Sequence, residues 1–168
     1  FEGVFGVAWS LEHLEMRKLS APRVVRETSF SVDHDLPKCE QDTERDYAGS
    51  GYDRGHRISA KDCAWSAAAM WDSFLMTNVF PQTKQLNEVK WLALENHVRS
   101  LVTDGKTEVW CYTGPVWEPD AHGNLTIATI GSHRVPVPHY CFKTVLIKNG
   151  GDVSVKAWLM PNTETPPD

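Results

Sequence analysis

Apolar residues recur at helical spacing in one long stretch of the chain, residues 86–102. With a turn of roughly 100° per residue, the large apolar side chains of this stretch gather on one face: Trp91, Leu94, Val98, Leu101 and Val102. The pattern predicts an amphipathic helix, and Gly105 shortly after it is typical of a helix stop. The alanines and large apolar residues of 64–74 predict a second helix.

Short apolar runs bounded by proline, glycine and asparagine predict strands. They cover residues 4–11, 23–28, 75–80, 108–113, 125–130, 133–137, 140–148 and 153–160. Asn149-Gly150-Gly151 has the composition of a tight hairpin turn between the last two. The polar residues 31–50 are expected to form a long surface loop, and the proline-rich tail 161–168 is expected to be loose. Together these elements predict an α+β fold.

The composition is that of an ordinary globular domain. The 168 residues are 41% hydrophobic and 23% charged, so we expect a single domain over residues 1–168. No apolar run approaches the roughly 18 residues of a membrane helix. The opening FEGVFGVAWS lacks the pattern of a signal peptide, which would also be true of a mature secreted protein or a trimmed chain.

The net charge of −5 disfavours a general affinity for nucleic acids. The objection is weak for an enzyme, because a few arginines and a divalent cation can make one cleft locally positive. The charge therefore predicts modest affinity for a polyanion outside such a cleft.

The cysteines do not settle the redox environment of the chain. Cys111 and Cys141 lie in apolar, strand-like runs and are expected to be small buried side chains. Cys39 and Cys63 lie in polar surroundings, where a bridge between them remains open. Their spacing has neither a C-x-x-C motif nor the rhythm of a zinc finger.

The densest chemistry is in Tyr52-Asp53-Arg54-Gly55-His56. Histidine can accept a proton near neutral pH, and arginine can hold a phosphate through two hydrogen bonds. The glycine permits close approach of backbone or substrate. Taken alone, the motif fits equally well a solvated turn in which Asp53 pairs with Arg54.

Two polar residues, Asn87 and Glu95, project onto the apolar side of the predicted helix 86–102. Burial there is costly unless each side chain finds partners. Alternatively, both reach water at the edge of the apolar stripe, or Asn87 caps the helix start. Asn78 and Gln82 lie at or just after the predicted strand 75–80, where an amide oxygen suits a hard cation. Ordinary strand-end hydrogen bonding is the alternative, and it is favoured for Gln82.

The order of these groups favours phosphodiester hydrolysis. A strand that ends in Asp-Arg-Gly-His, a second strand with Asn78 and a helix with Asn87 and Glu95 bring together an acid–base group, a cation site and phosphate-binding charge. The reaction needs an activated water, a metal on the phosphate and leaving oxygen, and charge neutralisation.

On these motifs the chain resembles the DNA/RNA non-specific endonucleases, a family of ββα-metal nucleases that includes secreted bacterial nucleases and mitochondrial endonuclease G. The resemblance lies in the signature 52–56, in the asparagine-bearing segment 73–82 and in the eight-residue spacing from Asn87 to Glu95. It continues through Arg26, Phe30, Asp33, Thr113-Gly114-Pro115, Val137-Pro138, Lys143 and Met160-Pro161-Asn162. It implies a central, mostly antiparallel β-sheet flanked by helices, and Mg²⁺-dependent, sequence-nonspecific endonuclease activity on DNA and RNA.

Position by position, the resemblance implies that His56 is the general base that activates the attacking water. Asn87 would be the direct protein ligand of a hydrated Mg²⁺, for which Mn²⁺ can substitute. That ion would stabilise the phosphate and the leaving oxygen. Glu95 would hold metal-bound waters, and Asp53 would order water near the ion.

The resemblance assigns Arg54 and Arg26 to the charge on the phosphate, with Arg23 as the competing choice for Arg26, and it implies that Asn78 shapes the site. The chain departs from the family in residues 57–62, where Arg57 and Lys61 add positive charge beside the base. The family fold also continues into further strand and helix beyond residue 162, where this chain has few residues left.

Two interpretations from other classes remain open. A nucleic-acid- or protein-binding module that lost catalysis would predict a broken motif, whereas the motif here is intact. A zinc-structured domain would use His34, Cys39, His56 and Cys63, whose spacings fit no common tetrahedral site. A nuclease toxin or effector domain would share the chemistry of the first interpretation.

Beyond the DNA and RNA substrates, the resemblance allows a homodimer and a protein inhibitor as partners. No membrane association is expected. The bacterial members of the family imply a secreted or periplasmic location.

Overall fold

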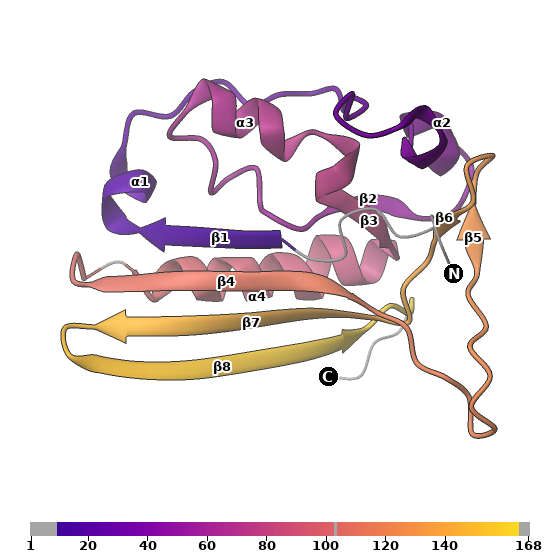
Figure 1. Ribbon diagram of the computed structural model, residues 1–168. Helices are drawn as coiled ribbons and strands as arrows, with labels where there is room; N and C mark the ends of the chain where they lie inside the picture. The colour runs from indigo at the N-terminus through magenta and orange to yellow at the C-terminus, as the bar shows by residue number, and fades with distance from the viewer. Residues whose placement is uncertain (1–9, 103, 165–168) are drawn as a thin grey trace.

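The computed structural model describes residues 10–102 and 104–164. Its main sheet has four strands in the order β1-β4-β7-β8: β1 is Ser10–Glu15, β4 is Thr107–Val116, β7 is Tyr140–Asn149 and β8 is Asp152–Pro161. Every neighbouring pair in this sheet is antiparallel (Figure 1). The β7–β8 turn contains Gly150 at φ +61, a left-handed conformation that glycine adopts readily. The prediction of an α+β fold with a mostly antiparallel central sheet is confirmed.

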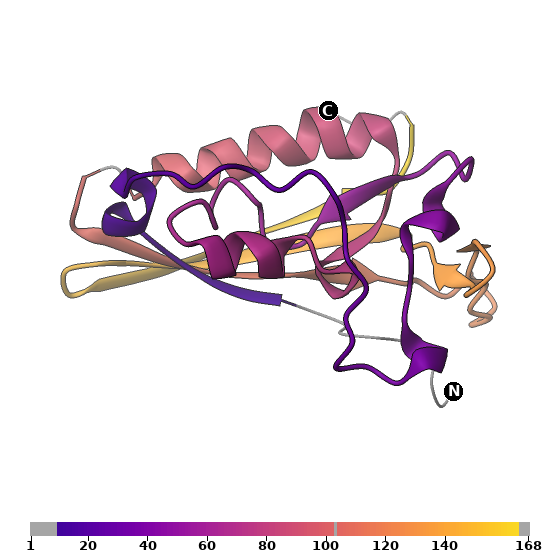
Figure 2. The same cartoon turned by 90° about the horizontal axis from the view of Figure 1, so that it is seen from above.

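One face of the sheet packs against the predicted helix. It runs through a π-helical first part, η3 (Leu86–Trp91), into α4 (Leu92–Ser100), and Figure 2 shows it lying along the sheet. Its apolar face packs against alternate residues of the strands, and the main core contains Leu14, Trp91, Leu94, Val98, Val102, Val109, Cys111, Cys141 and Val145. Burial of each large apolar side chain contributes roughly 1.5–3 kcal/mol. This core fixes the helix against the sheet.

A second, two-stranded sheet carries the motif residues. β2 (Asp53–His56) pairs antiparallel with β3 (Val79–Gln82), and β3 leads into η3 after a short connection. Between β2 and β3 lie α3 (Ala67–Ser73) and the 3₁₀ turn η2 (Met76–Asn78). The hydroxyl of Ser66 accepts a hydrogen bond from Ala69 N, so α3 begins three residues later than predicted. β2, β3 and the helix form the expected ββα unit.

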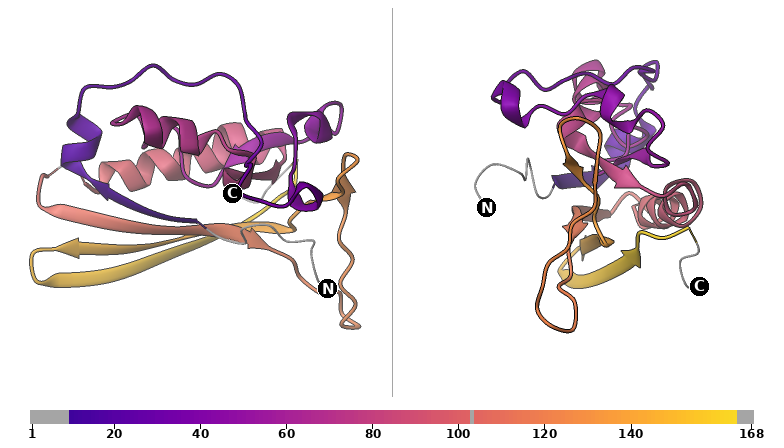
Figure 3. Two further views of the ribbon diagram at one scale, coloured as in Figure 1. Left: turned by 45° about the horizontal axis from the view of Figure 1, so that its top comes forward. Right: turned by 90° about the vertical axis from the view of Figure 1, so that its right-hand side faces the viewer.

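Short elements surround this unit: α1 (Met16–Ser20), η1 (Lys38–Glu40), α2 (Glu44–Tyr47), β5 (Thr129–Ile130) and β6 (Val135–Pro136). Figure 3 shows the connection from β4 to β5 extending away from the main sheet. The carboxylate of Asp46 joins α2 to the β5–β6 hairpin, because it accepts hydrogen bonds from Thr43 N, Ser132 Oγ and His133 N. Asp46 is 2% exposed, so α2 has a fixed place in the fold.

Several predicted strands differ from the structure. Residues 23–28 are not a strand: they run over the surface, mostly exposed, with the backbone bond Val24 N to Ala64 O. The predicted strand 75–80 begins as the turn η2, and β3 then continues through Pro81. Proline is tolerated there because β3 pairs with β2 alone, so its missing N–H lies on an edge. Residues 125–128 precede the short β5, and most of the predicted strand 4–11 lies outside the described residues.

The predicted loose tail covers residues 161–168, of which 165–168 lie outside the described residues; its first residues are held more firmly than predicted. β8 continues to Pro161, and Asn162 is buried. The Asn162 Nδ2 atom donates to the carbonyls of Pro81 and Pro138, and its Oδ1 accepts from Thr83 N at 2.8 Å. Asn162 thereby fixes the junction between β3 and η3. Within the part of the chain that the structure describes, no helix is both long and apolar enough to cross a membrane.

Replacing Asn162 by alanine should destabilise the fold by about 1–3 kcal/mol, because it leaves a buried donor and two buried carbonyls without a partner. Urea unfolding followed by tryptophan fluorescence measures the loss. The matched control is Asn124→Ala at an exposed turn, which should stay within about 0.5 kcal/mol of the parent chain. Equal stabilities for the two variants would contradict the role of Asn162.

Candidate active site

A cavity of about 630 Å³ opens between β2, α2 and the first turns of the η3–α4 helix. Its lining includes most of the predicted site residues: Arg26, Asp53, Arg54, His56, Asn87 and Glu95. They come from an extended surface segment, a strand and a helix that are far apart in the sequence. The fold therefore brings together the groups that the motif analysis selected.

His56 ends β2, and its ring packs against two aromatic side chains that also contact each other. The centroids of Phe30 and Phe74 lie 5.2 and 5.0 Å from that of His56. Burial, and then the positive charges of Arg26 and Arg54, lower the pKa of His56 from 6.5 to about 4. The imidazole is therefore neutral near pH 7 and able to accept a proton. Its Nε2 atom is buried and has no hydrogen-bond partner among the described residues.

Gly55 is required by the packing of β2 against β3. A Cβ atom at this position would lie 2.1 Å from Oε1 of Gln82 and 2.4 Å from its Cδ. Gln82 is fully buried and does not line the cavity. The close approach predicted for this glycine is therefore an approach of the Gln82 side chain, which fixes the position of the strand that carries His56.

Asn87 is oriented by Asp53. The Asn87 Nδ2 atom donates to Oδ2 of Asp53 at 3.0 Å. Because a carboxylate can only accept, the amide NH₂ must face Asp53, which leaves the amide oxygen available to the cavity. Asn87 does not cap the helix, since η3 has no side-chain cap. The local Asp53–Arg54 turn is also not what forms, because Arg54 instead contacts Glu44 at 3.0 Å.

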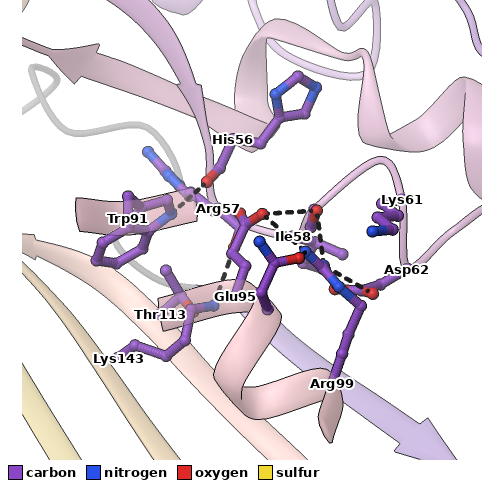
Figure 4. A network of polar contacts seen from close by, with 12 residues as sticks. His56, Arg57, Ile58, Lys61, Asp62, Trp91, Glu95, Arg99, Thr113 and Lys143 are labelled. Atoms are coloured by element: carbon purple, nitrogen blue, oxygen red, sulfur yellow. Dashed lines mark hydrogen bonds and ion pairs between the residues drawn. The ribbon is translucent and has the colours of Figure 1, made fainter. Parts of the chain in front are cut away.

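Glu95 lies in a buried polar network under the cavity (Figure 4). Its Oε2 accepts from Ser59 Oγ at 2.9 Å, and Arg99 Nη2 lies 3.7 Å away. Burial raises the pKa of Glu95, while the charges of Lys143 and Arg99 oppose that rise. Arg99 also bonds both oxygens of Asp62, so it connects the helix to the segment after β2.

Sequence reasoning missed Arg99 and Ser59 as parts of the site. The signal for Arg99 was its position four residues after Glu95, on the same helix face. Ser59 had no local signal, because its bond to Glu95 spans 36 positions. Lys143 entered only through the resemblance; its Nζ donates to Thr113 Oγ1 at 2.7 Å and lies 5.3 Å from the Trp91 ring.

Asn78 does not line the cavity. Its Nδ2 donates to the carbonyls of Ile58 and Ser73, and its Oδ1 accepts from Ile58 N at 3.1 Å. The amide is fully engaged in holding the segment after β2, so Asn78 acts on the site through that segment. Asn78 also belongs to the turn η2, whereas the sequence pattern predicts a strand at this position.

Arg26 and Arg23, the two candidates for the same role at the phosphate, lie in different places. Arg26 lines the cavity and lies 5.0 Å from the Phe74 ring, next to His56, whereas Arg23 donates to the Lys61 carbonyl. Of the two added cations after His56, Lys61 lines the cavity and Arg57 is buried beside Phe80. Only Lys61 can add positive charge where a substrate would lie.

The cysteine and zinc alternatives fail. All four cysteines are free, and the exposed Cys39 does not bridge to the buried Cys63. Across residues 10–102 and 104–164, no three histidine, cysteine or acidic side chains gather in an arrangement that could hold a metal. His34, Cys39, His56 and Cys63 therefore do not form a structural zinc site. Cys111 and Cys141 are buried, as predicted.

Comparison with known proteins gives a consistent set of relatives. The model of the DNA/RNA non-specific endonuclease family matches residues 6–168. Human mitochondrial endonuclease G is 35% identical, over a match that covers 94% of this chain and 54% of the human protein. The mitochondrial nuclease EXOG of Xenopus laevis is 32% identical, over a match that covers 92% of this chain and 45% of the EXOG chain. A crystal structure of the EndoG/EndoGI complex, on the mechanism of EndoG inhibition, matches with a TM-score of 0.84 at 28% identity, covering 95% of this chain and 69% of that one.

Gly55→Ala should destabilise the chain by about 1–3 kcal/mol, because the added methyl group overlaps the buried Gln82 side chain. Thermal unfolding of Gly55→Ala, Gln82→Ala and the double variant measures the coupling. The double variant should be more stable than the sum of the two losses predicts, since Gln82→Ala removes all three clashing atoms. The control is Gly151→Ala, where an added Cβ meets nothing within 4 Å. Strictly additive stability losses for Gly55→Ala and Gln82→Ala would contradict a close contact between the two residues.

Proposed function

Because the chain belongs to the DNA/RNA non-specific endonuclease family, we propose that it hydrolyses phosphodiester bonds of DNA and RNA without sequence preference and with the help of Mg²⁺. The observation that carries the proposal is the neutral His56 in a cavity that also holds Arg54 and the oriented amide of Asn87. These groups supply a base, a positive charge for the phosphate and an oxygen donor for a cation.

His56 is the general base in this proposal. A base must be unprotonated to accept a proton from water, and the lowered pKa of His56 keeps it so at neutral pH. The Phe30 and Phe74 rings, which also contact each other, both pack against the imidazole and limit the orientations that it can adopt. The Trp91 Nε1 atom also donates to the His56 carbonyl at 3.3 Å, which ties the base to the helix that carries Asn87.

The residues of the cavity fit a magnesium ion. Mg²⁺ takes oxygen ligands and keeps several of its waters, so one amide oxygen with nearby carboxylates is an appropriate donor set. Asn87 would hold the ion directly, and Glu95 and Asp53 would hold its waters. The raised pKa of the buried Glu95 fits this assignment, because a nearby cation would offset the cost of its charge. When bound, the ion would supply charge stabilisation at the phosphate and the leaving oxygen.

Charge and position come from the remaining residues. Arg54 and Arg26 would stabilise the phosphate charge, since guanidinium groups match phosphate oxygens and stay charged. Asp53 acts on the site by turning the Asn87 amide oxygen away from itself. Asn78 acts by holding the backbone after His56 in place.

The chain spans about half the length of the mitochondrial relatives it matches. A protein inhibitor is a proposed partner, supported by the matched structure of EndoG in complex with EndoGI; a homodimer stays a prediction. The mitochondrial names of these relatives lend no support to the predicted secreted or periplasmic location.

The purified chain should nick supercoiled plasmid and degrade structured RNA with Mg²⁺ or Mn²⁺, and EDTA should stop both reactions. His56→Ala should lower turnover at least about a hundredfold, as expected for the loss of a general base. His34→Ala, which removes an exposed histidine outside the cavity, is the matched control and should keep full activity. Undiminished cleavage by His56→Ala would refute the mechanism.

In the pH profile of kcat/KM, the fall in activity on acidification should occur well below pH 6.5, the ordinary pKa of histidine. The base works in its neutral form, and with a pKa of about 4 it stays mostly neutral down to about pH 5. Arg54→Gln should move this fall in activity to higher pH, because it removes a positive charge that lowers the His56 pKa. Titration of the His56 ring by NMR in the metal-free chain gives an independent value, and an inflection at 6.5 in both measurements would show the assignment to be wrong.

A further inference from the structure

The guanidinium proposed to bind phosphate is already paired with an acid of this chain. The Arg54 Nη1 atom lies 3.0 Å from Oε1 of Glu44, and both residues line the cavity. We infer, on the basis of the proposed function, that Glu44 competes with the substrate phosphate for Arg54 and thereby limits the affinity of the site for nucleic acid.

Glu44 is presented by a fixed backbone. It is the first residue of α2, which is held by a reciprocal hydrogen-bond pair between Thr43 and Asp46. Asp46 is itself bound by the β5–β6 hairpin through Ser132 and His133. The carboxylate is therefore delivered to Arg54 by the fold, and not by a chance meeting of two loose side chains.

The contact can nevertheless be displaced. The side chains of Arg54 and Glu44 remain 37% and 43% exposed, so each can rotate without breaking the core. Ion pairs with this much exposure are weak, because water and salt screen them. A phosphate that arrives at Arg54 can exchange with Glu44 at a moderate cost in affinity.

Geometry makes the two anions rivals. The Arg54 guanidinium lies 4.8 Å from the Phe30 ring, which limits the planes it can adopt. A phosphate held through two parallel hydrogen bonds needs two adjacent N–H groups of one plane. Glu44 occupies Nη1, so while it stays it takes the Nη1–Nη2 edge of Arg54 from the phosphate and leaves it the Nε–Nη2 edge. If Glu44 stays, its charge also repels the phosphate.

A positioning role for Glu44 predicts the opposite result. Its Oε1 atom also accepts from Phe30 N at 3.4 Å, and Phe30 packs on His56, so in this alternative Glu44 serves only to order the cavity wall. Loss of an ordering residue weakens substrate binding, whereas loss of a competitor tightens it. Glu44→Gln separates the two roles, because glutamine has the same shape and keeps an acceptor for Phe30 N.

Binding of a fluorescein-labelled DNA duplex, followed by anisotropy at fixed salt, tests the inference. The measurement uses the His56→Ala chain with Mg²⁺, in which loss of the general base keeps cleavage slow, so the proposed site is complete while binding is read. Glu44→Gln should lower Kd by about fivefold. Glu88→Gln is the matched control: Glu88 also lines the cavity, but its ionic partner is Lys84 at 3.9 Å, so its removal frees no arginine and should have a smaller effect.

The effect should also depend on Arg54. In an Arg54→Ala background, Glu44→Gln should lower the Kd for DNA by no more than Glu88→Gln does. The inference is overturned if Glu44→Gln binds DNA no more tightly than the parent chain. It is also overturned if Glu88→Gln increases the affinity for DNA equally, or if Glu44→Gln increases it in full in the Arg54→Ala background. Thermal unfolding checks that the variants fold, and Glu44→Ser replaces Glu44→Gln if that variant does not. Failure of every variant to bind DNA would overturn the proposed function as well, whereas binding that ignores Glu44 overturns the inference alone.

Discussion

The site depends on the buried ion pair between Arg99 and Asp62. Their side chains are 9% and 4% exposed, and the Arg99 Nη1 atom lies 2.9 and 3.0 Å from the two carboxylate oxygens. Removing one partner of such a pair leaves an uncompensated buried charge, at a cost of about 3–5 kcal/mol. Arg99 belongs to the helix that carries Asn87, and Asp62 follows the strand that ends at His56. The pair therefore fixes the two chemical groups of the cavity relative to each other.

The charges beneath the cavity form one coupled set. Glu12, Asp62 and Glu95 meet Arg99 and Lys143, and burial raises the pKa of each of the three acids. The pKa of Glu12 is raised to about 8, so this carboxyl is mostly neutral near pH 7, and Asp62 and Glu95 remain to face the two cations.

The upper wall of the cavity is built differently from its floor. It is formed by α2, which is joined to the β5–β6 hairpin through Asp46 and through a hydrophobic cluster that contains Tyr47, Ile130 and Val135. The side chains of α2 meet the cavity at Glu44 and Tyr47, while the floor is made by the helix and the segment after β2. His56 and Asn87 thus rest on a strand and a helix of the ββα unit, whereas the contact proposed to tune affinity comes from α2.

Local sequence determined the parts of this protein whose signals lie within a few residues. The helix of residues 86–102 follows from its apolar period, the β7–β8 hairpin from its Asn-Gly-Gly turn, and the choice of His56, Asn87 and Glu95 from an ordered set of motifs. Only the tertiary structure decided what depends on distant partners. Residues 23–28 have strand composition but no strand to pair with, Gly55 is explained by Gln82, and Arg54 meets an acid from another element. The physical reason is that periodicity and turn chemistry act within a few residues, whereas burial, pairing and pKa are set by whichever residues the fold brings near.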